Sequence, residues 1–530
     1  MFKVKMNYLL YIFITIYSLF IVYRASFGLI DDHIFLSTVF SGHSIPFFLS
    51  PEIGRFYPLD GQEYNLISFV SHSPVAFYLW NSLEYIIFAI VLFKIEEQLT
   101  GGSFRGRVYL FIIYVSFIGG MANLFLRLFV PERDALFFLT IALFFYIQFY
   151  YKSDRNWFYG ILSLICANIS LYYKEPMFIL VGGFSFFHLL FDYKKGYKKI
   201  NPLDVLWMLS SLIFLLIYYF VIFQNHDGSY YGQLTINKWI VHLKNSSLFF
   251  LTNPFILCLF IPFLIIRIYL LIRKRDRVNA MFDSMALSAA GYFLAIIVLN
   301  IYSPYYLMPL YLYAFFSVSY NLNIIKKIYP KLFFSCLGGF LFLAIFSAIP
   351  FGIHQFSVWK NVPNNFQQTV SFLKKYLDGK PVRVGIFLYG VNRNTGVEVY
   401  NSFGEFMQSE NISTKKYDLK TDEVDNNILR KAKVYNSSPY SVFHQLKPQK
   451  ITQEDLVVVG NFSQKEFNPK SFDAHYRLLF KSKSPIFNFG DYSLKSIVKY
   501  GVNKVIGKNN FVSDNIFNLP INFYVYKKIN

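Results

Sequence analysis

Residues 6–23 read MNYLLYIFITIYSLFIVY and contain no charged side chain. Crossing a bilayer core about 30 Å thick takes about 20 apolar residues in a helix, so this run predicts a transmembrane helix. Lys3 and Lys5 precede the run, and no clean small-x-small site follows it, which favours an uncleaved anchor over a removed signal peptide. The acidic stretch LIDDHIFL, residues 29–36, begins just beyond its end.

This run is the first of eleven that predict an α-helical polytopic membrane protein. Only 15% of the 530 residues are charged and 55% are hydrophobic, whereas soluble globular chains carry about 25% charged residues. The net charge of +20 is better explained by membrane topology and anionic lipid than by nucleic acid, which we exclude as a partner. The predicted spans lie near residues 6–23, 74–93, 108–129, 134–151, 157–172, 176–191, 204–223, 248–270, 281–300, 305–322 and 332–351.

Basic residues gather in alternate gaps between these runs, which predicts the sidedness. By the positive-inside rule these gaps are cytoplasmic, so the N-terminus is expected inside the cell and the C-terminus outside the inner or plasma membrane. The first external loop then spans about residues 24–73. The basic clusters are Lys3/Lys5, Lys94/Arg105/Arg107, Lys152/Arg155, Lys194/Lys195/Lys198/Lys199, Arg273/Lys274/Arg275/Arg277 and Lys326/Lys327/Lys331.

The chain divides into a transmembrane domain, residues 1–351, and a polar domain, residues 352–530. Apolar β-branched runs alternate with amphipathic helices in the second part, which predicts a small extracytoplasmic α/β domain. We expect helices near residues 362–377 and 397–409, and strands at 382–389, 456–460, 476–481 and 522–526.

Asp31 and Asp32 form an acidic pair at the exit of the first span. Two neighbouring carboxylates can bind a divalent metal, or one can act as general base while the other orients it. A solvated acidic loop is the alternative interpretation. The same external loop continues as GRFYPLDGQEYNLISFVSHSP, residues 54–74, which includes Arg55, Asp60 and Glu63 among aromatic side chains. It handles substrate or serves as a second anchor lying in the interface plane.

Two later external turns also carry charges. The turn RLFVPERDALFF contains Arg127, Glu132 and Arg133, where an arginine can clamp a phosphate or the charges simply mark the interface. The turn LYYKEPMF contains Lys174 and Glu175, which either neutralise each other or face a lipid phosphate and a sugar hydroxyl.

Glu84 lies inside the second predicted span. An acid at that depth is a functional hypothesis by default, and pairing with a neighbouring helix is the alternative. The sequence contains no Walker loop, HExxH, GxSxG or paired-cysteine motif, and so gives no sign of nucleotide chemistry.

Together these motifs resemble the GT-C superfamily of integral-membrane glycosyltransferases over nearly the whole chain. The resemblance rests on Asp31–Asp32, PERD before the fourth span, YYKEP before the sixth, and SPYYLMPLY before the tenth. Tyr305 in the last segment stands where arginine is frequent in the family. A C-terminal extracytoplasmic α/β domain is also similar to many members.

The resemblance implies an inverting transfer from a polyprenyl-phosphate-linked sugar to an extracytoplasmic acceptor in cell-envelope or polysaccharide biosynthesis: a glycan, lipid or protein. It implies Asp31 as general base, with Asp32 as partner carboxylate; their roles can be exchanged. Both are the expected metal ligands if a divalent cation, Mg²⁺ or Mn²⁺, is used. The expected substrate-binding residues are Arg55, Glu84, Arg127, Glu132, Arg133, Lys174, Glu175 and Tyr305.

Three other functions remain open. A polysaccharide polymerase or ligase more often depends on a large loop between late spans, whereas the long acidic loop here comes first. A transporter of lipid-linked saccharide would favour two similar halves and charged midplane residues, and only Glu84 fits that pattern. A non-catalytic envelope scaffold would tolerate neutralisation of Asp31 and Asp32.

Overall fold

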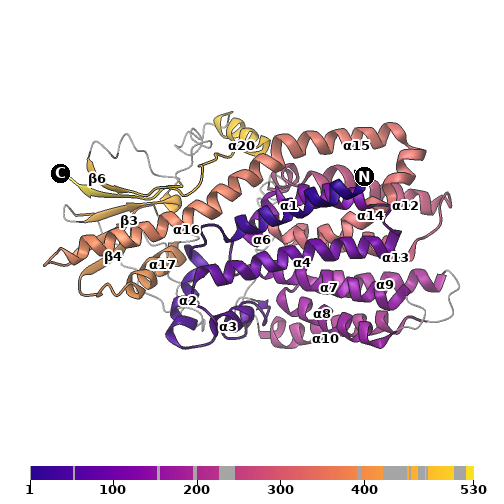
Figure 1. Ribbon diagram of the computed structural model, residues 1–530, viewed down its shortest axis with the longest axis horizontal. Helices are drawn as coiled ribbons and strands as arrows, with labels where there is room; N and C mark the ends of the chain where they lie inside the picture. Colours follow the sequence, from indigo (N-terminus) through magenta and orange to yellow (C-terminus); the bar gives the residue numbers. More distant parts are fainter. Residues whose placement is uncertain are drawn as a thin grey trace.

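The computed structural model describes residues 2–529 except 52–53, 152–155, 195–199, 226–244, 391–395, 422–450, 453–454, 464–471, 473–474 and 506–520. The molecule is elongated, with a bundle of helices at one end and a sheet domain at the other (Figure 1). The N-terminus lies at the end of the bundle remote from the sheet domain, and the C-terminus lies in that domain (Figure 1). Some predicted basic clusters, at 152–155 and 195–199, fall outside the described residues.

Helices occupy all eleven predicted apolar runs, which confirms a multi-pass, mostly helical membrane protein. Six of the described helices are long and apolar enough to cross a membrane, or seven if one bent pair is a single span. Three shorter apolar helices accompany them, so the total of eleven spans stays a prediction. The bundle helices are α1 (Phe2–Val22), α4 (Pro74–Thr100), α5 (Arg105–Ser116), α6 (Gly119–Phe125), α7 (Pro131–Tyr151), α8 (Trp157–Tyr173), α9 (Met177–Lys194), α10 (Pro202–Val221), η5 (Phe255–Phe260), α12 (Ile261–Ile272), α13 (Ala280–Val298), α14 (Met308–Ile328), α15 (Pro330–Leu343) and η7 (Ala344–Ala348).

The predicted third span is broken, because α6 is bent 73° from α5. The break packs closely against the following part of the chain: a Cβ on Gly352 would lie 1.9 Å from the carbonyl oxygen of Phe117. A Cβ on Gly119 would lie 2.4 Å from the ring of Phe351. Glycine at these two positions therefore lets the backbones approach, and the bend directs the chain after α6 toward the first external loop.

The loop after α1, which was predicted to be external, folds into short elements around an aromatic core. The ring of Phe35 lies 5.1 Å from that of Tyr64, 4.7 Å from that of Phe77 and 4.8 Å from that of Phe129. This core fixes the loop against the bundle, between it and the sheet domain. Its elements are η1 (Ile30–Asp32), α2 (His33–Ser37), η2 (Val39–Ser41), β1 (Leu49–Ser50), β2 (Arg55–Phe56) and α3 (Gln62–Ser68).

The C-terminal domain is built on a five-stranded sheet in the order β4-β3-β5-β7-β6, which confirms the predicted α/β class. Strand β3 pairs in parallel with β4 and β5, while β7 is antiparallel to β5 and β6. The elements are α16 (Ile349–Asp378), β3 (Val384–Leu388), α17 (Gly396–Ser409), β4 (Tyr417–Thr421), β5 (Leu456–Val459), β6 (Tyr476–Lys481), α20 (Leu494–Val505) and β7 (Tyr524–Lys528).

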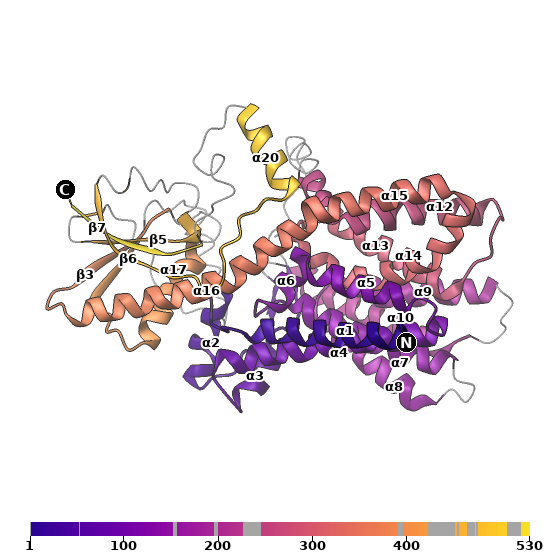
Figure 2. The same ribbon diagram turned by 45° about the horizontal axis from the view of Figure 1, so that its top comes forward.

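The junction of the two domains differs from the expectation. The helix predicted near residues 362–377 is the second half of α16, which continues the last apolar run without a loop and contains Pro363. Strand β4 and helix α20 were not predicted. Figure 2 shows α16 running from the bundle along the sheet domain.

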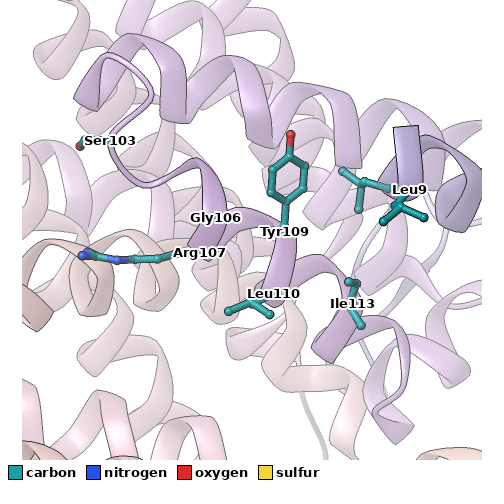
Figure 3. Close-up of a pocket in the computed structure, with 8 residues that line it drawn as sticks. Leu9, Ser103, Gly106, Arg107, Tyr109, Leu110 and Ile113 are labelled. Atoms are coloured by element: carbon teal, nitrogen blue, oxygen red, sulfur yellow. The ribbon is translucent and has the colours of Figure 1, made fainter. Parts of the chain in front are cut away.

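A groove of about 480 Å³ opens at the other end of the bundle, between α1 and α5 (Figure 3). Leu9, Leu110 and Ile113 supply apolar walls, and Arg107 lies at one side. The guanidinium of Arg107 donates to the side chain of Asn323 at 2.7 Å. Because it lies near the N-terminal half of α1, this groove is separate from the acidic motif that follows the end of that helix.

Candidate active site

Asp31 and Arg127 bring the acidic motif and the turn between α6 and α7 together. The guanidinium of Arg127 lies 3.2 Å from a carboxylate oxygen of the partly exposed Asp31. It also lies over the rings of Trp359, at 4.4 Å, and Tyr305, at 5.9 Å. The faces of aromatic rings attract a positive charge, so these contacts help to hold the guanidinium in place.

Asn81 of α4 positions the turn that carries Arg127. Its side-chain amide donates to the backbone carbonyls of Phe125, at 3.1 Å, and Arg127, at 3.0 Å. The hydroxyl of Tyr78 donates to the carbonyl of Leu126 at 3.3 Å. These bonds satisfy carbonyls that the end of α6 leaves without helical partners.

Asp32 has a different environment from its neighbour. Its buried carboxylate accepts the backbone N–H of Gly28 at 2.6 Å. Burial raises the pKa of Asp32 to about 7, with the negative charge of Asp31 adding to the rise and the Gly28 bond opposing it. Asp31 thus faces a guanidinium, while Asp32 has a pKa near neutrality because it is buried.

The C-terminal domain holds the backbone just before this pair. Ile30 has a φ of +75°, a conformation that is strained for a β-branched residue. The hydroxyl of Ser402, in α17, accepts the N–H of Ile30 at 2.8 Å and lies 3.2 Å from the carbonyl oxygen of the same residue. The ring of His33 contacts both this carbonyl and Ser402.

Lys174 provides a second cation at the same end of the bundle. Its ammonium group forms a buried ion pair with Glu132 at 2.9 Å. It also lies 4.7 Å from the ring centre of Tyr57 and 5.0 Å from that of Tyr306. The turns PERD and YKE therefore meet the SPYY segment.

Arg55 and Glu175 join the loop after α1 to the turn between α8 and α9. Their side chains form an ion pair at 3.1 Å, and the same carboxylate oxygen accepts the N–H of Phe56 at 3.1 Å. The Arg55 guanidinium also lies 4.8 Å from the ring centre of Tyr57. These contacts hold strand β2 and Tyr57 next to Lys174.

Asp60 joins this group of acids although it was not among the expected substrate-binding residues. Burial raises the pKa of Asp60 to about 8. The charge of Lys174 opposes the rise, and those of Asp134, Glu132 and Asp31 add to it. Asp60 is therefore largely protonated near neutral pH and can donate or accept a hydrogen bond.

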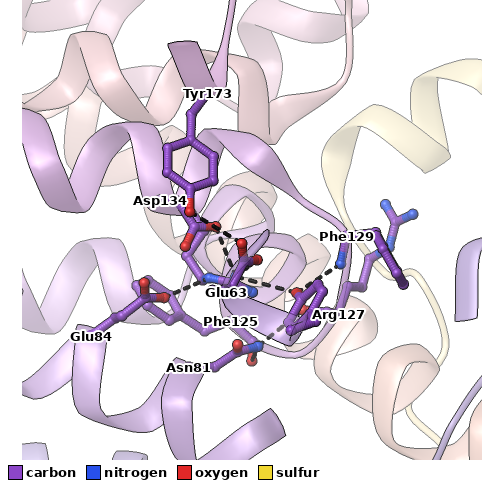
Figure 4. Close-up of polar contacts among 10 residues, drawn as sticks. Glu63, Asn81, Glu84, Phe125, Arg127, Phe129, Asp134 and Tyr173 are labelled. Atoms are coloured by element: carbon purple, nitrogen blue, oxygen red, sulfur yellow. Dashed lines mark hydrogen bonds and ion pairs between the residues drawn. The ribbon is translucent and has the colours of Figure 1, made fainter. Parts of the chain in front are cut away.

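Arg133 lies in a separate, fully buried cluster (Figure 4). Its guanidinium lies 2.6 Å from Glu84, 2.7 Å from Asp134 and 3.2 Å from Glu63. Tyr173 donates to the second oxygen of Glu63 at 3.1 Å. In Figure 4 the side chain of Arg127 points away from this cluster.

One guanidinium cannot neutralise three ionised carboxylates, so the Arg133 cluster retains protons. Burial raises the pKa of Glu63 well above its usual value, and the charge of Asp134 adds to the rise. The cluster joins α3 to α4 and α7. This geometry favours a structural role for Arg133 and Glu84. Lys174 and Arg55 are also buried, whereas Arg127 is partly exposed beside the acidic pair.

The acidic pair does not present a metal-binding set. Among the residues that the structure describes, no three His, Cys, Asp or Glu side chains converge as ligands. Asp31 faces Arg127 and Asp32 faces the N–H of Gly28. As arranged here, these two side chains do not fit a divalent cation.

No protein-family model and no curated protein matches the sequence. Among solved structures, the chain is similar to crystal structures of ArnT from Cupriavidus metallidurans. The apo state has a TM-score of 0.42 and 8% identity, covering 88% of this chain and 94% of that one. The structure bound to undecaprenyl phosphate has a TM-score of 0.40 and 9% identity, covering 89% and 96%.

Trp359 and Ser402 are the contributions to the site that the sequence did not reveal. Both follow the last apolar run, far along the chain from the acidic motif. Their proximity to Arg127 and Ile30 depends on the path of α16 and the docking of α17. An isolated tryptophan in a helix and a lone serine carry no local signal of this role.

Proposed function

We propose that this membrane protein is a glycosyltransferase that moves a sugar from a polyprenyl-phosphate-linked donor to an acceptor, with inversion at the anomeric carbon. The observation that carries the proposal is the meeting of the Asp31–Asp32 pair with Arg127. Both residue types that such a transfer requires, an acid able to accept a proton and a cation able to stabilise phosphate, lie there within ion-pair distance.

In the proposed reaction an acceptor hydroxyl oxygen attacks the anomeric carbon as the bond from that carbon to the phosphate oxygen breaks. Asp31 accepts the hydroxyl proton as general base. The bond electrons remain on the leaving polyprenyl phosphate, whose charge Arg127 and Lys174 stabilise. Asp32 orients Asp31, and Asp60 forms a hydrogen bond with a sugar or acceptor hydroxyl.

Glu132, Glu175, Arg55 and Tyr305 complete the proposed site. Glu132 and Arg55 hold the two partners Lys174 and Glu175 in place, and Tyr305 presents its ring to Arg127. The tyrosine stands where the GT-C resemblance expects an arginine, and Arg127 lies beside it. Arg127 therefore supplies the cation that this segment lacks.

We further propose that the site faces away from the cytoplasm, with the N-terminus inside. The alternation of basic clusters supports this sidedness, and it suits a lipid-linked donor because no soluble nucleotide is needed there. The acceptor is a glycan, lipid or protein of the cell envelope.

The test is glycan profiling of a deletion strain complemented with wild-type protein or with Asp31→Asn/Asp32→Asn. We expect wild type to restore the missing glycan and the double variant to fail at equal membrane abundance. Glu97→Gln is the matched control, because Glu97 is a half-exposed acid of α4 that pairs with Lys94 and Arg105 and is remote from the site. Full restoration by the double variant would refute the catalytic assignment.

A further inference from the structure

Helix α20 turns its apolar side away from the protein. At about 100° per residue, Leu494, Ile497, Val498, Val502 and Val505 occupy an arc of about 140°. The exposed fractions are 47% for Ile497, 40% for Val498, 43% for Val502 and 87% for Val505. Ser493 and Ser496 are buried instead. A helix on a soluble domain normally buries its apolar arc, so this surface requires another explanation.

The segment before α20 fixes the helix at the junction between the two domains. The carbonyl of Phe489 lies 2.7 Å from the ring nitrogen Nδ1 of His354 in α16. The N–H of Phe489 donates to the hydroxyl of Ser357 at 2.9 Å. The ammonium group of Lys495 then lies 4.5 Å from the ring centre of Phe351. Figure 2 shows α20 beside the point where α16 leaves the bundle.

The neighbouring bundle surface is also apolar and exposed. Residues Pro330–Asp378, which contain α15, η7 and α16, form a candidate membrane span, and only 22% of its apolar window is buried. Phe342, Ile345 and Phe346 are all more than half exposed. In a multi-pass membrane protein, lipid covers such a surface. Helix α20 contacts η7, so its apolar arc continues the lipid-facing surface.

The charges of α20 identify the kind of membrane region that it fits. Lys495, Lys499 and Lys504 lie on the helix, and its twelve residues include no Asp or Glu. On the helical wheel these lysines lie on both sides of the apolar arc. Lysines that flank an apolar arc place their ammonium groups at head-group level when the helix lies in the interface plane.

We propose that α20 is a peripheral membrane anchor of the C-terminal domain. Its apolar arc lies at the boundary of head groups and acyl chains, and Lys499 and Lys504 contact anionic phosphate head groups of the leaflet on the side of the sheet domain. The anchor fixes that domain at a set height above the leaflet. This proposal is independent of the reaction catalysed.

The test measures the depth of α20 in proteoliposomes containing the full-length protein. Cys166, Cys258 and Cys336 are replaced by alanine, and a single cysteine at Val502 or Val505 carries a nitroxide label. Leu478→Cys is the matched control, because Leu478 is a half-exposed apolar residue on strand β6 of the same domain. We expect labels at Val502 and Val505 to be relaxed more by oxygen than by a water-soluble nickel chelate, and the label at Leu478 to show the opposite.

If the nickel chelate relaxes the labels at Val502, Val505 and Leu478 equally, and more than oxygen does, the proposal is overturned. Protection from both reagents with dipolar coupling between two labels would also overturn it, because a second copy of the chain would then cover the arc.

Lipid composition tests the charge component separately. In vesicles of phosphatidylcholine with phosphatidylglycerol, the Val505 label should lie deeper than in phosphatidylcholine alone. Lys499→Gln/Lys504→Gln should remove this difference while leaving the elution volume of the purified protein unchanged. A depth independent of both composition and the lysines would refute anionic recognition.

Discussion

The hydroxyl of Ser402 accepts the backbone N–H of Ile30 at 2.8 Å, although the two residues are 372 positions apart. Ile30 directly precedes the acidic pair and has a φ of +75°. The C-terminal domain thus stabilises a strained backbone conformation at the residue that sets the direction of Asp31. This contact makes the domain part of the site rather than a neighbour of it.

Ser402→Ala should lower the rate of transfer more than the stability. One hydrogen bond contributes about 0.5–1.5 kcal/mol, which corresponds to a loss of roughly 2- to 10-fold in rate if it acts on the position of Asp31. The measurement compares kcat and KM in membranes with the melting temperature of the purified protein. Ser402→Thr retains the hydroxyl and should recover most of the rate, whereas a loss equal to that of alanine would contradict a hydrogen-bonding role.

Arg127→Lys should behave almost like Arg127→Gln. Lysine keeps a positive charge but lacks the planar group that lies over Trp359 and reaches Asp31. Losing one stabilising group at a leaving phosphate costs about 10²- to 10³-fold in rate. Glycan profiling and transfer assays at equal abundance check this, with the half-exposed Arg105→Gln as control. Activity of Arg127→Lys near that of wild type would show that the planar guanidinium of Arg127 is not required.

The rate should rise with pH around neutrality. The pKa of Asp32 is raised to about 7 by burial, so its carboxylate forms as the pH increases from about 6 to 8. If an ionised Asp32 strengthens Asp31 as a base, this limb follows Asp32. Asp32→Asn should flatten the limb between pH 6 and 8. If the rate of that variant still rises with pH with the same apparent pKa, a group other than Asp32 causes the rise.

Stability should fall as the pH rises through about 8. The pKa of Asp60 is raised from 3.8 to about 8, so its folded state favours the protonated form. Its contribution to stability is complete below pH 4 and is lost as the pH rises through about 8, where the proton leaves. Melting temperatures from pH 6 to 9 test this. Asparagine cannot ionise, so the melting temperature of Asp60→Asn should fall less with pH than that of wild type. The same dependence on pH in both proteins would refute a contribution from Asp60.

Arg133→Gln should unfold the protein rather than alter its specificity. Removing the cation leaves Glu63, Glu84 and Asp134 without a charge partner in the buried cluster, and breaking a buried pair costs about 3–5 kcal/mol. Glu84→Gln removes one excess acid and should be tolerated far better. Melting temperatures of the purified variants in detergent test this prediction, with Glu97→Gln as control. A stable Arg133→Gln protein that uses a different donor would instead indicate that Arg133 contacts substrate.

Local patterns were sufficient to predict the elements of the fold. Apolar runs predict helices directly because lipid leaves few alternatives for the backbone, and short apolar runs, several of them β-branched, located strands β3, β5, β6 and β7. Strand β4 was missed because YDLKT, residues 417–421, is half polar and lies at the sheet edge. The helix predicted near residues 362–377 is present, but it begins earlier than predicted, because α16 continues from the last apolar run through Pro363.

The site was predictable in its residue types and less so in their partners. Charged motifs in alternate gaps indicated that Asp31, Arg127, Lys174 and Glu175 share one face, and the structure places them together. Arg127 and Arg133 are only six residues apart, and nothing local distinguishes them. The two arginines have different environments: Arg133 forms ion pairs with Glu63 and Glu84, whereas Arg127 lies over the ring of Trp359.

The continuous helix through residues 330–378 has a mechanical consequence. Its 49 residues extend about 70 Å and belong to both the bundle and the sheet domain. Because one helix joins the two domains without a loop, its backbone hydrogen bonds resist a change in the angle between the bundle and the sheet domain. If the protein transfers a sugar as proposed, an acceptor reaches the site while the C-terminal domain keeps its position relative to the bundle.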